Sequence, residues 1–163
     1  MDSLRDAGHG VRVLDLAPNS YRGETKGCEY LYGDWQDDGL LGRTLEGAEC
    51  VYHLIGTVDV DQANANPDDD VRQTVLGSIN LLHGCVARQV RRVVFVSSGG
   101  AVYGVPRMIP IREDHPTDPI SAHGISKLTV EKYLQLFGRL HGLEYQIARC
   151  ANPYGERQNP FRN

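Results

Sequence analysis

Two side chains that could take part in proton transfer, His123 and Lys127, stand four residues apart in the segment Ile120–Tyr133 (ISAHGISKLTVEKY). The segment predicts a capped helix, and residues four apart lie on the same face of a helix. An imidazole can shuttle protons near neutral pH, and a neighbouring cation favours the neutral ring, which is the form that accepts a proton. The spacing therefore predicts acid–base chemistry on this face.

A second candidate site is the string Phe95–Gly104 (FVSSGGAVYG), in which a strand runs into two serines and two glycines. Such a string delivers the hydroxyls of Ser97 and Ser98 and exposed backbone to the carboxyl edge of a sheet, where open α/β folds bind ligands. A simple turn would explain the glycines but not the whole string. We therefore expect a ligand at this edge.

Acidic residues end the first two predicted strands. Asp15 closes the run VRVLD, and in doubly wound dinucleotide folds an acidic residue at that place binds ribose hydroxyls. An Asp also ends strands simply by capping a turn, so both interpretations stay open. The same holds for Asp34 in the GD pair after the second strand, and the adjacent Trp35 is a candidate for stacking near an adenine.

Short β-branched runs alternate with amphipathic stretches, which predicts an α/β fold with a doubly wound parallel sheet covered on both faces. The predicted strands are residues 11–16, 29–34, 50–56, 92–98 and 144–150. The predicted helices are residues 38–47, 68–89 and 121–142, preceded by the last turns of a helix at 3–10. In the long helix, the expected buried face consists of residues at helical spacing: Val71, Val75, Ile79, Leu82 and Val86.

Composition excludes several classes of function. Hydrophobic residues make up 40% of the chain, and its formal net charge is −4. Residues 1–70 are acidic and residues 71–163 basic, but the basic side chains are scattered, so no nucleic-acid partner is expected. The four cysteines lie far apart, which argues against a zinc site or a disulfide framework. No signal peptide or membrane span is recognisable, so we expect a cytoplasmic protein with no membrane partner.

Six sequence blocks, taken together with their order along the chain, are typical of a known protein family. They are HGVRVLDL, GDW followed by LEGAECVYHLIG, NP followed by VLGSINLL, RRVVFVSSGGAVYG, DPISAHGISKLTVEKY and RCANPYGERQNP. From about Leu4 onward the chain resembles the extended short-chain dehydrogenase/reductase superfamily, in particular the NAD-dependent nucleotide-sugar epimerases and dehydratases such as UDP-glucose 4-epimerase. The resemblance implies a Rossmann-like domain, NAD as cofactor, a nucleotide sugar as substrate, transient oxidation of a sugar hydroxyl, and a homodimer.

The resemblance also implies roles for single residues. In the family, a Tyr-x-x-x-Lys pair carries out the proton chemistry and the lysine holds the nicotinamide ribose; Lys127 matches the lysine, and His123 stands at the tyrosine. Ser98 is the nearest substitute for a loop hydroxyl that orients the sugar. Cofactor contacts are implied for Asp15, Asp34, Trp35, Leu54, Ile55, Gly56, Thr74, Ser97, Lys127, Cys150 and Ala151, and substrate contacts for Ser98, Gly99 and Asn152.

Several positions depart from the family pattern. The ring nitrogen of His123 stops roughly 2 Å short of a phenol oxygen, and general-base catalysis depends first on reach. The family's loop hydroxyl would fall at Gly99 or Ala101, and Thr74 takes the place of an asparagine. These departures leave open that the chain is a catalytically inactive remnant, a binding or assembly module, or a nucleotide sensor of the same fold.

The two ends of the sequence lead to further expectations. In the family, a strand and a Gly-x-x-Gly-x-x-Gly turn come before the segment that matches Leu4, and that strand lies in the middle of the sheet. Its absence should leave two strands without a central partner. The family's smaller nucleotide-sugar domain takes shape beyond Asn163. We therefore expect residues 1–163 to be a partial NAD-binding Rossmann domain.

Overall fold

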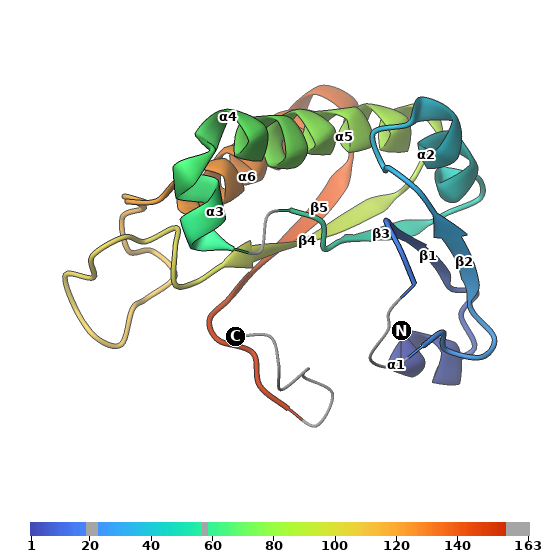
Figure 1. Cartoon of the computed structure of the whole chain (residues 1–163), viewed down its shortest axis with the longest axis horizontal. Coiled ribbons are helices and arrows are strands. Elements are labelled where there is room, and N and C mark those ends of the chain that lie inside the picture. Colours follow the sequence, from blue (N-terminus) through green and yellow to red (C-terminus); the bar gives the residue numbers. More distant parts are fainter. Residues whose placement is uncertain (19–22, 57–58, 156–163) are drawn as a thin grey trace. The chain divides into compact units, whose positions relative to one another are not determined.

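The computed structural model describes residues 1–18, 23–56 and 59–155. The described residues form two compact units, one of Met1–Ala48 with Tyr154 and Gly155, and one of Glu49–Pro153. Each unit contains its own parallel strands with packed helices, in the α/β order that the sequence predicts (Figure 1). Within the described residues, no helix is long and apolar enough to cross a membrane.

The first unit is built on two parallel strands, β1 (Arg12–Asp15) and β2 (Glu29–Tyr32), with helices α1 (Asp2–Asp6) and α2 (Asp38–Leu45). Arg12 fixes α2 against β1, because its Nη1 donates to three carbonyl oxygens near the end of α2, at 2.8 to 3.1 Å. The last carbonyls of a helix lack a full set of partners within it, so the guanidinium satisfies these acceptors, of which Arg43 O also accepts from Glu46 N at 3.4 Å. Its Nε bonds Glu29, the residue opposite on β2, at 2.7 Å.

The second unit contains a sheet of three parallel strands in the order β3 (Cys50–His53), β4 (Arg92–Ser98) and β5 (Glu144–Cys150). Along β4, burial alternates as a strand's pleat requires: Val93, Phe95 and Ser97 are buried, and the residues between them are half-buried. All three strands run in the same direction, so their carboxyl ends meet at one edge of the sheet. The edge of the sheet at which the sequence analysis expected a ligand is therefore formed by the ends of these three strands.

The helices of this unit lie along one face of its sheet (Figure 1). They are α3 (Val60–Ala65), α4 (Pro67–Asp70), the π-helical segment η1 (Val71–Leu76), α5 (Gly77–Ala87) and α6 (Ala122–His141). The other face carries no helix of the same unit, within the described residues. Ser121 caps α6 by accepting a hydrogen bond from Gly124 N at 3.1 Å, and Gly142 ends the helix in the left-handed conformation.

Two of the described strands, β1 and β3, each lack a strand partner on one edge, as expected. The described strands form two separate sheets, β1-β2 and β3-β4-β5, and neither β1 nor β3 has a strand partner on its second edge among these residues. The sequence predicted two strands lacking a central neighbour, and the pairing agrees with that prediction.

The long helix is where the prediction was wrong in detail. Instead of one α-helix over residues 68–89, the chain forms α4, η1 and α5, and Val71 at the start of the expected buried face is 43% exposed. The wider π-helical turn changes which side chains face the interior. The buried residues are Asp70, Thr74, Val75, Gly77, Ser78, Leu81, Leu82 and Cys85, three of which carry a hydroxyl or carboxylate. The short helix α3 was not predicted, and β3 ends at His53 rather than Gly56.

Candidate functional site

Lys127 points into the interior of the second unit. Lys127 is only 6% exposed. Its Nζ donates to the carbonyl oxygen of Val96 at 3.2 Å, and the ammonium lies 4.9 Å from the ring centre of Phe95. Both partners belong to β4. Burial lowers the pKa of Lys127 below its ordinary value, and the negative charge of Asp70 partly offsets this effect. The helix thus delivers a cation to the sheet near the carboxyl end of its central strand.

Two other predicted cofactor residues meet Lys127. A Cβ atom placed on Gly56 would lie 3.2 Å from Lys127 Nζ and 3.6 Å from the methyl carbon of Thr74. Gly56 has φ +152°, a backbone conformation that side chains disfavour. The structure therefore brings the segment after β3, the η1 helix and α6 together at one point.

The buried carboxylate of Asp70 is hydrogen-bonded to residues of both η1 and α6. Asp70 is 2% exposed, and its two oxygens accept hydrogen bonds from Ser126 Oγ at 2.5 Å and from Thr74 Oγ1 at 3.3 Å. Ser126 is the residue before Lys127 on α6. Sequence analysis missed Asp70, because it assigned the buried face of that helix to apolar side chains alone.

His53 is a further buried polar residue that the sequence analysis missed. Its Nε2 lies 2.7 Å from Ser78 Oγ, which donates its own proton to the carbonyl of Thr74 at 2.5 Å, so the network assigns the imidazole proton to Nε2. Burial, and then the charge of Lys127, lower the pKa of His53 to about 3. The ring is therefore neutral at pH 7. The signal that could have revealed it is its inward place in the β3 alternation.

A second polar cluster fixes α6 to the sheet one turn beyond Lys127. Glu131, 1% exposed, accepts hydrogen bonds from Arg149 Nε and Nη2 at 3.0 and 2.7 Å and from Ser97 Oγ at 2.6 Å. Arg149 also donates to Tyr103 Oη at 2.9 Å and lies over its ring. Ser97, predicted to contact a cofactor, thus uses its hydroxyl proton inside the protein.

The predicted substrate loop begins at the ends of β4 and β5. Gly99 N donates to Cys150 O at 2.7 Å, and a Cβ on Gly99 would lie 2.9 Å from Arg149 O and 3.3 Å from Ala151 N. A side chain at this position would therefore press on the backbone of β5 and the residue that follows it. Ser98 Oγ accepts a hydrogen bond from Ala101 N at 3.2 Å, which stabilises the turn and leaves its proton to donate.

The remaining predicted residues of this unit lie as follows. His123 is half-buried in the first turn of α6, one helical turn before Lys127 and on the same face. Leu54 is 66% exposed, so it is not a core residue, whereas Ile55 is half-buried. Asn152 and Ala151 follow β5 and are exposed.

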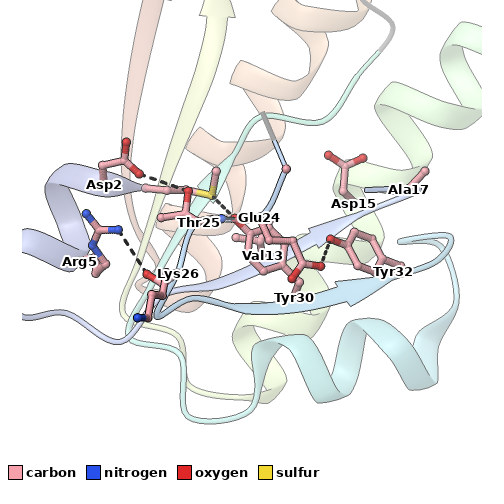
Figure 2. A pocket seen from close by; sticks show the side chains of 12 residues that line it. Asp2, Arg5, Val13, Asp15, Ala17, Glu24, Thr25, Lys26, Tyr30 and Tyr32 are labelled. Carbon is pink, nitrogen blue, oxygen red and sulfur yellow. Dashed lines mark hydrogen bonds between the residues drawn. The ribbon is translucent and has the colours of Figure 1, made fainter. Parts of the chain in front are cut away.

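The first unit holds the other three predicted cofactor residues. Asp15 lines a surface hollow of about 290 Å³, where Tyr32 donates to Glu24 at 2.5 Å (Figure 2). One Asp15 oxygen accepts from Leu16 N at 2.7 Å. Asp34 accepts from Gln36 N at 2.9 Å, so it caps a turn, the simpler of its two interpretations. Trp35 is only 4% exposed, and a buried ring offers little surface for an adenine to stack on.

Comparison with known proteins identifies the fold family. The sequence profile of the NAD dependent epimerase/dehydratase family matches residues 1–163. The chain belongs to this family. A putative UDP-glucose 4-epimerase of Methanocaldococcus jannaschii is 37% identical over 162 residues, which cover 98% of this chain and 53% of that protein.

Solved structures of epimerase/dehydratase family members superpose closely. UDP-glucose 4-epimerase of Thermotoga maritima with UDP-glucose matches with a TM-score of 0.88 and 33% identity, covering 98% of this chain and 53% of that one. The Thermus thermophilus UDP-glucose 4-epimerase complex with NAD gives a TM-score of 0.89 at 33% identity, with coverage of 98% and 52%. The chain therefore spans about half the length of the family members that it matches.

Proposed function

We propose that residues 1–163 form the NAD-binding part of a nucleotide-sugar epimerase or dehydratase of the UDP-glucose 4-epimerase type, and that residues outside this range complete the sugar site. The observation that carries the proposal is the meeting of Lys127, Gly56 and Thr74. A buried ammonium beside a side-chain-free backbone suits a ribose bearing hydroxyl acceptors. Relatives named as UDP-glucose 4-epimerases support the substrate class.

The residues of the second unit fit a nicotinamide nucleotide. Gly56 leaves open the space that a Cβ would fill, and Gly99 draws β4 and β5 together so that Cys150 and Ala151 line the same edge. We assign Lys127 to the ribose hydroxyls next to the nicotinamide. Asp15 is assigned to the adenosine ribose from the family resemblance alone. The cofactor, when bound, supplies a transient hydride acceptor, which the protein's own side chains lack.

We assign proton transfer to His123. Its imidazole takes the proton from the sugar hydroxyl and returns it, while the charge of Lys127 favours the neutral ring that accepts a proton. Ser98 holds the hydroxyl by donating the proton that its bond with Ala101 leaves free. A histidine is shorter than a tyrosine, so the family's proton transfer is expected to run below its usual rate in this chain.

A second candidate function is a catalytically inactive binding module of the same fold. Two observations favour it, His123 at the tyrosine position and Gly99 in a site that has no room for a side chain. In this case the chain binds the nucleotide and transfers no hydride.

We further propose a cytoplasmic homodimer with no nucleic-acid or membrane partner. The four cysteines Cys28, Cys50, Cys85 and Cys150 are free thiols, which is compatible with a reducing compartment. Ile125, Leu136 and Leu140 form an exposed apolar stripe on α6 and suit a second copy of the chain. Light scattering coupled to gel filtration should give the mass of two chains; the mass of one chain would contradict the dimer.

The two candidate functions differ in one measurement. Protein that includes the residues completing the sugar site is mixed with NAD and UDP-glucose, and the fluorescence of transiently reduced nicotinamide is followed for the wild type and for a His123→Tyr variant. NAD binding to both proteins is measured separately by calorimetric titration. An enzyme site predicts slow reduction in the wild type and a rate about 10²-fold higher with tyrosine. Binding of NAD without reduction in either protein would support the inactive module, and no binding in either would contradict both.

A further inference from the structure

The turn that carries Ser98 is held at both of its ends by buried polar side chains. It runs from Ser98 to Val102, and two hydrogen bonds close it, from Ala101 N to Ser98 Oγ at 3.2 Å and from Val102 N to Ser98 O at 3.3 Å. Ser97, just before the turn, is 4% exposed, and Tyr103, just after it, is 6% exposed. The geometry of this turn therefore decides where the Ser98 hydroxyl points.

Arg149 and Glu131 connect the two ends of the turn. Arg149 on β5 lies opposite Ser97 in the register with β4. Glu131 on α6 accepts from Ser97 Oγ at 2.6 Å and from Arg149 Nε and Nη2 at 3.0 and 2.7 Å. The third guanidinium nitrogen, Nη1, donates to Tyr103 Oη at 2.9 Å, and the guanidinium carbon lies 4.8 Å from the centre of the Tyr103 ring. One planar cation thus links the residue after the turn to the carboxylate that holds the residue before it.

We propose that Tyr103 is a positioning residue for Ser98: its hydroxyl, bound by Arg149, fixes the end of the turn and so directs the free proton of Ser98 toward the sugar hydroxyl. The turn contains Gly99 and Gly100, and glycine backbones have the most conformational freedom to lose, so the turn depends on contacts outside it for a fixed geometry. The inference rests on the proposed function for the task of Ser98, but not for how the turn is held.

Packing by the Tyr103 ring is separable from the role of its hydroxyl. The ring also meets His115 edge to face, with the ring centres 5.7 Å apart. A Tyr103→Phe variant keeps the ring and removes the hydroxyl alone. An Arg149→Lys variant keeps a cation for Glu131 but lacks the planar fork that reaches Tyr103 at the same time. Tyr145→Phe is the matched control, because it removes a hydroxyl from an exposed ring on the same strand as Arg149.

The first test measures backbone amide hydrogen exchange by nuclear magnetic resonance on the cofactor-free chain. The Ala101 amide reports on the turn directly, because its acceptor is Ser98 Oγ. We expect it to exchange at least about tenfold faster in Tyr103→Phe and in Arg149→Lys, and at the wild-type rate in Tyr145→Phe. An unchanged Ala101 rate in Tyr103→Phe, or an equal acceleration in Tyr145→Phe, would overturn the proposal. An equal acceleration along all of β4 in Tyr103→Phe would show a general loss of stability and would also overturn it.

The second test asks whether Tyr103 acts through Ser98. In protein that includes the residues completing the sugar site, Tyr103→Phe should slow nicotinamide reduction by UDP-glucose about tenfold and leave the affinity for NAD unchanged. In a Ser98→Ala background, Tyr103→Phe should slow the reaction no further, because residues that act as a unit are not additive. A full second slowing in that background would overturn the proposal.

The two tests separate this inference from the proposed function. The exchange measurement needs no nucleotide, so a failure of NAD to bind would contradict the proposed function and not the role of Tyr103. A wild type that reduces no nicotinamide would contradict the enzyme function, and the exchange measurement alone would then decide for or against Tyr103.

Discussion

Lys127 Nζ lies 3.2 Å from the point where Gly56 would carry a Cβ, so the lysine and the glycine share one small space at the end of the sheet. The two residues are 71 positions apart in sequence, and three elements of the second unit converge to bring them together. The proposed cofactor site depends on this contact.

Replacing Gly56 by alanine tests that dependence. The new methyl group would press on the ammonium, and the backbone at φ +152° would be strained. We expect a loss of about 1 to 3 kcal/mol in the free energy of unfolding, measured by urea denaturation. Gly100→Ala is the control, because nothing lies within 4 Å of a Cβ there. Equal stability of the two variants would argue against the crowding.

The ion pair of Arg149 and Glu131 should contribute more to the free energy of unfolding than an exposed ion pair does. An Arg149→Met variant leaves the carboxylate of Glu131 buried without its cation, which we expect to lower the free energy of unfolding by about 3 kcal/mol. Arg92→Met breaks the exposed pair with Glu144 and should cost less than about 1 kcal/mol. The same denaturation measurement compares them, and a comparable loss in both variants would contradict the assigned burial.

His53 predicts how stability changes with pH. Its pKa in the folded state is about 3 against an ordinary 6.5, so below pH 6.5 the unfolded chain binds a proton that the folded chain does not. The contribution of His53 is complete above pH 6.5 and is lost as the pH falls from there toward 3. A His53→Gln variant should flatten this slope, whereas His9→Asn, at an exposed site, should leave it unchanged. An unaltered slope in His53→Gln would contradict the prediction.

A serine in place of Gly99 should destabilise the fold. A serine there would place its Cβ 2.9 Å from Arg149 O, so β4 and β5 would have to separate. We expect a loss of about 1 to 3 kcal/mol and a lower melting temperature, measured by circular dichroism. Gly100→Ser has open space and should melt close to the wild type. A Gly99→Ser protein as stable as Gly100→Ser would show that the loop adapts.

The strands could be predicted from sequence because β-branched runs and the six blocks are local signals. The same holds for α6, whose cap and apolar spacing predict its extent. The missing strand partners of β1 and β3 were expected from the family resemblance rather than from any single residue.

The rest could not be predicted because it depends on contacts distant in sequence. In the sequence, Asp70 is one of three consecutive aspartates, and only the fold shows that it alone is buried. The buried face of the long helix also carries Ser78 and Asp70, which bond His53 and Ser126 from other elements, so it is not the apolar face that the spacing predicted. The interpretation of Trp35 as a stacking residue likewise missed its burial.

The central claim is that Lys127 holds a nicotinamide nucleotide, and calorimetric titration with NAD tests it most directly. The wild type is compared with Lys127→Met and with Lys132→Met, which changes an exposed lysine on the same helix. The account predicts measurable binding to the wild type and to Lys132→Met, and at least about tenfold weaker binding to Lys127→Met, the equivalent of about 1.4 kcal/mol. Equal affinity of all three proteins, or no heat from the wild type, would contradict it.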